Sequence, residues 1–124
     1  IRRQRQMCIR DRARGVDTYC GEITLALRAQ YPEITLEAAI PCPSQPEGWL
    51  TADRVRWRRL LALCDMETLV QDHYTPGCML RRNRYMVDHS ALVIAIYDGT
   101  NGGTRRTLEY ALRQKVPFVD IPPV

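Results

Sequence analysis

The run of apolar and β-branched residues at 91–97, Ala-Leu-Val-Ile-Ala-Ile-Tyr, constrains the fold of this chain most strongly. A short, uninterrupted apolar run is typical of a strand that is buried on both faces, as in a parallel sheet. A glycine-rich loop at 98–104 follows it, and then a helical pattern at 104–115. A strand, a loop and a helix in this order predict a βαβ arrangement in which helices cover a sheet.

Other segments of the chain alternate between helical and strand patterns in the same way. Helices are predicted at 17–30, 51–63 and 79–88, and strands at 34–40, 67–71 and 117–121. Four helices alternating with four strands predict an α/β, Rossmann-like fold with an open, mainly parallel sheet and helices on both faces. Because the alternation begins on a helix, one sheet edge is unexplained, and we expect the first strands to be missing.

The composition is that of an ordinary globular domain. The 124 residues are 45% hydrophobic and 26% charged, which excludes a disordered or collagen-like chain. No apolar run reaches the roughly 20 residues that a membrane helix needs, so no membrane association is expected. Five cysteines, odd in number and without C-x-x-C spacing, favour a reduced cytoplasmic protein over a disulfide framework or a zinc knuckle. His73 and His89 have no partner at metal-ligand spacing, so no metal site is predicted.

The excess positive charge gathers at the N-terminus. Residues 1–14 contain six arginines and one aspartate, whereas residues 15–124 contain 12 basic and 13 acidic side chains. Such a leader can be a basic arm that binds phosphates. The interpretation that we favour is that residues 1–12 are not native, because 7–12 (Met-Cys-Ile-Arg-Asp-Arg) reads like the translation of a transposon-type sequencing adaptor. The domain then begins near residue 13.

The loop after the strand at 91–97 is the strongest candidate for a ligand site. In open α/β sheets, ligands bind beyond the carboxyl ends of the strands, close to helix N-termini. Adjacent glycines let the backbone approach a ligand, and the amides of the following helix attract a phosphate. The candidate ligand residues are Asp98, Gly99, Gly102, Gly103 and Thr104. The alternative is a glycine-rich turn that only connects strand and helix.

Two further segments are candidates for ligand contacts. Gly15 and Asp17 stand at the start of the first predicted helix, where Asp17 caps the helix, contacts a ligand or does both. Arg82 and Asn83 lie near the start of the third predicted helix and suit a phosphate or a ribose; the alternative is a solvated basic face. Cys42 follows a predicted strand, but no base can be named for a nucleophile there.

Several strings that carry these candidates occur in a definite order: Gly15-Val16-Asp17-Thr18, Pro41-Cys42, Tyr74-Thr75-Pro76-Gly77-Cys78-Met79, Arg82-Asn83-Arg84-Tyr85-Met86-Val87-Asp88-His89-Ser90, and Tyr97-Asp98-Gly99 with Gly102-Gly103-Thr104. In order and spacing they resemble the YpsA-like branch of the SLOG superfamily, over essentially all of residues 15–124. That superfamily has a Rossmann-like fold and unites the DNA-processing protein DprA with LOG-type phosphoribohydrolases. The resemblance implies a nucleotide-derived ligand, such as ADP-ribose, NAD or another nucleotide.

The resemblance also assigns roles to individual residues. Gly15 and Asp17 would end a first glycine-rich ligand loop, and Arg82-Asn83 matches an Arg-Asn pair of the DprA branch. The loop residues 98–104 would form the second phosphate loop. The family's opening strand with a Thr-Gly-His-Arg-Pro-like motif, and a second strand that ends in Gly-Gly, do not precede Gly15. Residues 13–124 would therefore be the C-terminal two-thirds of a single domain of this type.

The catalytic loop of LOG-type enzymes, P-G-G-x-G-T-x-x-E, fits poorly. Aligning Gly102-Gly103 with its glycine pair brings Glu109 to the catalytic position, but Arg105-Arg106 then replaces Gly-Thr. Aligning Gly103-Thr104 with the Gly-Thr puts Thr107 where the acid should be. Glu109 is thus the one weak catalytic candidate. Because no complete catalytic constellation is present, enzymatic activity stays open but is not the interpretation that we favour.

Three functions remain as hypotheses. We favour binding or sensing of a nucleotide-derived ligand, with a phosphate held by the glycine-rich loops. A LOG-type nucleotide phosphoribohydrolase, with Glu109 as its acid, is the first alternative. A DprA-like binder of single-stranded nucleic acid is the second, suggested by Arg81, Arg82 and Arg84 and predicting affinity that falls steeply with salt. A homo-oligomer is a further expectation.

Overall fold

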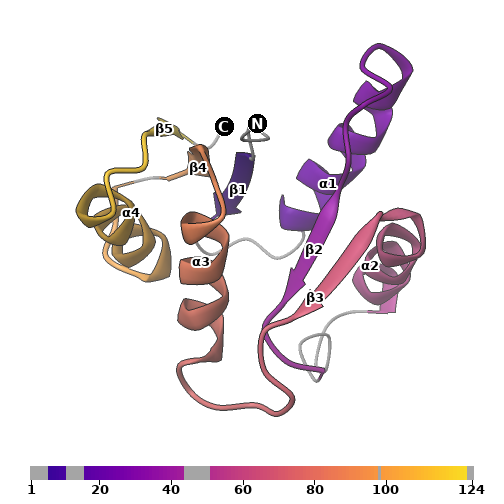
Figure 1. Cartoon of the computed structure of the whole chain (residues 1–124). Helices are drawn as coiled ribbons and strands as arrows, with labels where there is room; N and C mark the ends of the chain where they lie inside the picture. Colours follow the sequence, from indigo (N-terminus) through magenta and orange to yellow (C-terminus); the bar gives the residue numbers. More distant parts are fainter. Residues whose placement is uncertain (1–5, 11–15, 44–50, 98, 123–124) are drawn as a thin grey trace. The chain divides into compact units, whose positions relative to one another are not determined.

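The computed structural model describes residues 6–10, 16–43, 51–97 and 99–122 (Figure 1). Its contacts divide the chain into two compact units. The first, here called the three-stranded unit, consists of residues 1–14 and 79–124. The second, the two-stranded unit, consists of residues 15–78.

The sheet of the three-stranded unit is parallel and has the order β1-β4-β5. Its strands are β1 (Gln6–Arg10), β4 (Leu92–Ile96) and β5 (Phe118–Ile121). The central strand β4 lies within the apolar run at 91–97, as predicted, and pairs in parallel with both neighbours. The helices of this unit are α3 (Cys78–Asp88, from Met79 onward) and α4 (Gly103–Arg113) (Figure 1).

The hydrophobic core of this unit lies between β4 and the two helices. It consists of Val87 from α3, Val93 and Ala95 from β4, and Leu108 and Ala111 from α4. The other side chains of β4, Leu92, Ile94 and Ile96, are only half-buried. The sequence predicted a strand that is buried on both faces. In the structure, β4 is fully buried only on the face that packs against α3 and α4.

The two-stranded unit contains α1 (Val16–Ala26), the short 3-10 helix η1 (Leu27–Ala29), β2 (Glu37–Ile40), α2 (Thr51–Leu63) and β3 (Met66–Leu69). Strands β2 and β3 pair in parallel. Two backbone bonds extend the pairing beyond both ends, from the Asp65 amide to the Leu36 carbonyl (2.8 Å) and from the Val70 amide to the Ile40 carbonyl (2.8 Å). Helices α1 and α2 meet where Gly21 faces Leu60.

The α/β class and the helix–strand alternation predicted from the sequence are confirmed. All pairings among the described strands are parallel, and they fall into sheets of three and two strands. The strand predicted at 34–40 begins only at Glu37, since the Ile34 carbonyl accepts a hydrogen bond from Arg28 Nε (3.0 Å). The helix predicted at 17–30 ends at Ala26 and continues as η1.

Strand β1 lies in the segment for which the sequence analysis predicted no element. Its residues pair with β4 in the register Gln6↔Leu92 to Arg10↔Ile96. The sheet therefore has a strand ahead of the first helix, on the edge that was left unexplained. The non-native origin of residues 1–12 and the extent of the domain over 13–124 stay predictions.

None of the helices in the described ranges combines the length and the apolar character that a membrane crossing requires.

Candidate functional site

The loop that joins β4 to α4 starts with a bend that depends on glycine. Gly99 has a φ of +89°, a left-handed conformation that L side chains rarely adopt. The Tyr97 hydroxyl donates to the Thr100 carbonyl (2.9 Å), which ties the start of the loop to its middle. Asp98, a predicted ligand residue, lies outside the described residues. The loop is thus a built turn at the carboxyl end of β4, where the sequence analysis expected a ligand.

Helix α4 begins at the predicted phosphate loop and has no side-chain cap among the described residues. Gly102 is its N-cap residue and Gly103 its first helical residue. The first amides of a helix have no partner within the helix, and the helix dipole makes this end attractive to anions. A Cβ atom added at Gly103 would meet nothing within 4 Å, so the space beside this residue is open. The side chain of Thr104 is buried.

A chain of hydrogen bonds connects the Arg82-Asn83 pair to this helix start. Arg82 Nε donates to Asn83 Oδ1 (2.8 Å), and Asn83 Nδ2 donates to Thr107 Oγ1 (3.1 Å). The Thr107 hydroxyl in turn donates to the Gly103 carbonyl (2.8 Å). Asn83 is only 8% exposed and Thr107 is fully buried. The structure therefore brings together two candidate groups that are about 20 residues apart in sequence.

Thr107 takes part in this series of hydrogen bonds, and it was not among the ligand residues predicted from the sequence. Its hydroxyl both accepts from α3 and donates within α4, so it joins the two helices at the loop. The only signal in the sequence was its place four residues after Gly103, where a threonine can donate to the carbonyl one turn earlier.

Glu109 lies on an exposed part of α4. Its carboxylate accepts a hydrogen bond from Arg105 Nε (3.2 Å), an ion pair one helical turn apart in which both side chains are about half exposed. Arg105 also donates to the Asn101 side chain. The Glu109 carboxylate is thus exposed and already paired with a cation. A catalytic role for Glu109 stays a prediction.

The remaining predicted ligand residues belong to the two-stranded unit. Gly15 lies outside the described residues. Asp17 is the second residue of α1, which begins at Val16, so it lies within the first turn and not at the N-cap position predicted from the sequence. Their ligand roles stay predictions.

The basic side chains of α3 have different surroundings. The Arg84 guanidinium lies over the Tyr110 ring, 5.3 Å from its centroid, and Arg113 lies 5.7 Å from the same centroid. The Tyr110 hydroxyl donates to Asp88 Oδ1 (2.6 Å), and this hydrogen bond, more than burial, raises the pKa of Tyr110. Arg84 is therefore part of a surface cluster. Arg82, in contrast, takes part in the series of hydrogen bonds that leads through Asn83 and Thr107 to α4.

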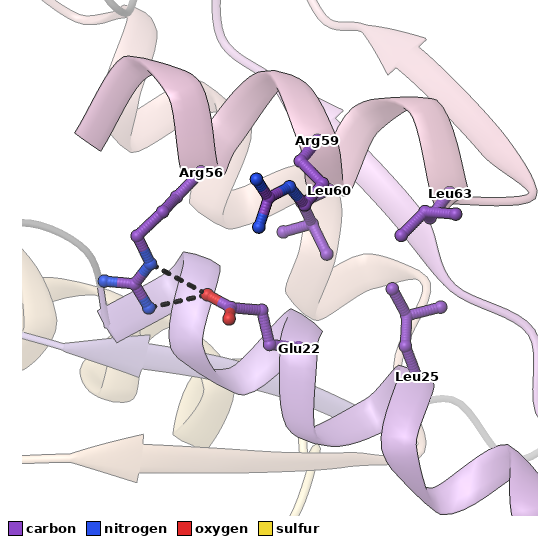
Figure 2. Close-up of a pocket in the computed structure, with 6 residues that line it drawn as sticks. All are labelled: Glu22, Leu25, Arg56, Arg59, Leu60 and Leu63. Carbon is purple, nitrogen blue, oxygen red and sulfur yellow. Dashed lines mark hydrogen bonds and ion pairs between the residues drawn. The ribbon is translucent and has the colours of Figure 1, made fainter. Parts of the chain in front are cut away.

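A shallow groove lies elsewhere, between α1 and α2 (Figure 2). It is lined by Glu22, Leu25, Arg56, Arg59, Leu60 and Leu63 and has a volume of about 40 Å³. Arg56 donates from Nε (3.1 Å) and Nη2 (2.6 Å) to Glu22 Oε1 across it. Small-molecule sites are usually about 300–1,000 Å³, and none of the predicted ligand residues lines this groove.

Both histidines are exposed, and each is bonded locally. His73 Nδ1 lies 2.6 Å from Asp72 Oδ1, an interaction that lowers the pKa of Asp72. His89 Nδ1 lies 2.7 Å from the Tyr85 carbonyl. Across the described ranges, the side chains of His, Cys, Asp and Glu form no group of three that could hold a metal ion.

The sequence is similar to those of two known bacterial proteins. The sequence is 31% identical over 111 residues to the uncharacterized SPbeta prophage-derived protein YoqJ of Bacillus subtilis (strain 168), an alignment covering 80% of this chain and 65% of YoqJ. It is 23% identical over 103 residues to a UPF0398 protein of Bacillus thuringiensis (strain Al Hakam), covering 82% of this chain and 56% of that protein. The chain thus spans less than two thirds of the length of either relative.

The family model YpsA, described as the YspA SLOG family, matches residues 3–117. The matched range includes β1 and every other described strand and helix up to the end of α4. This chain therefore belongs to the YpsA family of SLOG proteins.

Proposed function

We propose that this chain binds a nucleotide-derived ligand, of the ADP-ribose, NAD or mononucleotide class, through a phosphate group held at the start of α4. The observation that carries the proposal is the chain of hydrogen bonds from Arg82 through Asn83 and Thr107 to Gly103. These bonds connect the Arg82 side chain to the start of α4. No described side chain caps that end of the helix. A guanidinium and a helix N-terminus are two groups that bind phosphate well.

The roles of the residues follow from their chemistry. The amides of Gly103 and Thr104 would donate to phosphate oxygens, with the open space beside Gly103 admitting the group. Arg82 would supply the positive charge. Asn83 and Thr107 would act as positioning residues, because their hydrogen bonds fix Arg82 and the first turn of α4 without needing to touch the ligand. This division makes the proposal testable residue by residue.

The main test is calorimetric titration of the chain with ADP-ribose, NAD and AMP, using the Gly103→Asp variant. The aspartate fits the open space and suits the first turn of a helix, so the fold should be unaffected. Its carboxylate would repel a phosphate at the same place. We expect affinity to fall by about tenfold or more, which corresponds to about 1.4 kcal/mol.

Two controls separate charge from shape. Gly103→Ala adds a methyl group without charge and should keep its affinity within about twofold, since nothing lies within 4 Å of the added atom. Gln114→Glu adds the same charge at the C-cap of the same helix and should leave binding unchanged. Binding by Gly103→Asp that equals that of the parent chain would exclude this site.

The pair Arg82→Ala and Arg81→Ala distinguishes a ligand site from a basic surface. A built phosphate site predicts that the Arg82 variant loses binding while the variant of its exposed neighbour Arg81 keeps it. A surface that binds nucleic acid predicts similar losses in both variants, together with a steep dependence on salt. Both variants are titrated with AMP and with a single-stranded oligonucleotide at two salt concentrations. The losses of affinity then distinguish the phosphate site from a nucleic-acid surface.

A further inference from the structure

Two cysteines that are 36 residues apart in sequence lie next to each other inside the two-stranded unit. Cys42 Sγ and Cys78 Sγ are 4.0 Å apart, and the two residues are 1% and 0% exposed. Both are present as thiols. A disulfide needs about 2.05 Å between the sulfur atoms, so an approach of about 2 Å would join them. Neither the ligand site described above nor any predicted metal site uses this pair.

The backbone around Cys42 is held by the end of the two-stranded sheet. Cys42 follows β2 directly after Pro41, and the Pro41 carbonyl accepts a hydrogen bond from the Gln71 amide (3.2 Å). Pro41 itself is fully buried, and the proline on each side of Cys42 restricts the local backbone. The position of this sulfur is therefore determined by the β2–β3 pairing.

The other sulfur is positioned from the same glutamine. Gln71 Nε2 donates to the His73 carbonyl (2.7 Å) and to Thr75 Oγ1 (2.8 Å), which shapes the turn ahead of α3. The Thr75 carbonyl then accepts from the Cys78 amide (3.1 Å). Gln71 thus bonds to the segments that carry both cysteines, so the short distance between the sulfurs is built into the fold rather than left to two independent loops.

We propose that Cys42 and Cys78 form a reversible disulfide when the protein meets a hydroperoxide. One thiolate attacks the peroxide, breaking the O–O bond; its sulfur becomes a sulfenic acid and an alcohol, or water from hydrogen peroxide, is released. The second sulfur attacks the sulfenic sulfur, forms the S–S bond and expels water. Two thiols lose two electrons and two protons in all, and a dithiol reductant reverses the reaction by exchange.

The other described cysteines provide the contrast. Cys20 and Cys64 are half-buried, and the Cys64 thiol donates to the Leu61 carbonyl (3.1 Å). Burial, with a smaller contribution from Glu67, raises the pKa of Cys64. These residues make suitable substitution sites for isolating the pair.

The experiment uses the full chain with Cys8→Ser, Cys20→Ser and Cys64→Ser, which leaves only Cys42 and Cys78. The protein is treated with hydrogen peroxide, unfolded, and labelled with a maleimide. We expect both thiols to disappear together, the intact mass to fall by two hydrogen atoms, the product to remain a monomer, and dithiothreitol to restore both thiols. The oxidised form should also unfold at a higher temperature, since the crosslink restricts the unfolded chain.

Three results would overturn the proposal: both thiols remaining labelled after peroxide treatment that fully oxidises a small thiol, a crosslinked dimer as the product, or a gain of oxygen that dithiothreitol does not reverse. Adding Cys42→Ser gives the matched control, in which the loss of two hydrogens must vanish.

A peptide map of the parent chain avoids reliance on multiple substitutions. Trypsin puts Cys42 in the peptide 29–54 but Cys64 and Cys78 together in the peptide 60–81. The single variant Cys64→Ser therefore assigns the crosslink. In that variant, a peroxide-dependent link between these two peptides supports the proposal, and its absence contradicts it.

Discussion

The two units of the molecule are stabilised by different kinds of contact. In the three-stranded unit, α4 buries Thr104, Thr107, Leu108 and Ala111, a stripe with the spacing of one helix face, against β4 and α3. In the two-stranded unit, the described part of α2 has no buried residue, and Met66 and Leu69 of β3 are about half exposed. The buried apolar side chains of this unit, Ile40, Cys42 and Cys78, lie outside α2 and β3. Close contacts and polar links connect its two longer helices, such as Gly21 against Leu60 and Glu22 with Arg56.

The hydrogen bonds of the candidate site lie in the unit with the larger apolar core. The bonds from Asn83 to Thr107 and from Thr107 to Gly103 lie beside the apolar cluster of the three-stranded unit, on the same two helices. Buried hydrogen bonds are costly to break because the freed groups have no water to bond. We therefore expect the conformation of the predicted phosphate loop to depend on the core of its own unit.

The largest effect is expected from Leu108→Ala in the three-stranded unit. Leu108 is 6% exposed within the core cluster, so its truncation should cost about 2–5 kcal/mol of unfolding free energy. Urea denaturation followed by circular dichroism measures the loss. The matched control is Leu112→Ala on the same helix, 63% exposed, which should change stability by less than about 0.5 kcal/mol. Equal losses in both variants would mean that the core is not where the structure has it.

A smaller effect is expected at the helix contact of the two-stranded unit. A Cβ atom at Gly21 would lie 2.7 Å from Leu60 Cδ2, so Gly21→Ala forces Leu60 to shift and should cost about 1 kcal/mol. In a Leu60→Ala background the clash is absent, and the same change should stabilise by up to about 1 kcal/mol because alanine favours helix over glycine. A double-mutant cycle measured by thermal unfolding tests this change of sign. Additive effects would contradict the contact.

The ion pair across the groove should contribute less again. Both side chains of Glu22–Arg56 are more than 40% exposed, so Glu22→Gln is expected to lower stability by less than about 1 kcal/mol (Figure 2). Unfolding measured at low and high salt should show the difference shrinking, because ions screen exposed charges. Glu33→Gln, at an exposed glutamate of the same unit, is the control. A loss that does not depend on salt would point to packing instead.

The smallest effect concerns the Tyr110–Asp88 hydrogen bond on the surface of the three-stranded unit. Its contribution to stability is lost only at alkaline pH. The hydrogen bond to Asp88 raises the pKa of Tyr110 in the folded chain above its unfolded value. Its contribution is therefore complete below the unfolded tyrosine pKa of about 10 and is lost as pH rises through the folded value. Asp88→Asn should lower the pKa of Tyr110, as followed by site-specific NMR of its ring carbon. An unchanged titration would show that Asp88 does not hold the hydroxyl.

Prediction from the sequence succeeded where the signal is local. The apolar run around β4, the glycine-rich loop and the pattern of α4 predicted a strand, a loop and a helix, and the structure confirms all three. Strand β1 was missed because residues 1–12 were interpreted as non-native and were left out of the fold prediction. The strand forms by pairing with β4, which lies more than 80 residues away in sequence. The 3-10 turn at Leu27–Ala29 was missed because a helical pattern does not mark a tightened last turn.

By itself, the sequence determined the α/β class, the location of the phosphate-loop candidates and membership of a SLOG family. Each of these depends on short motifs and local periodicity, which can be recognised without the tertiary structure. The tertiary structure alone decided that Asn83 reaches Thr107, that Gly21 faces Leu60 and that Cys42 lies beside Cys78. Such contacts join residues from 24 to 39 positions apart, and no local pattern encodes them. They exist because packing and strand pairing bring distant segments together, and both depend on the whole fold.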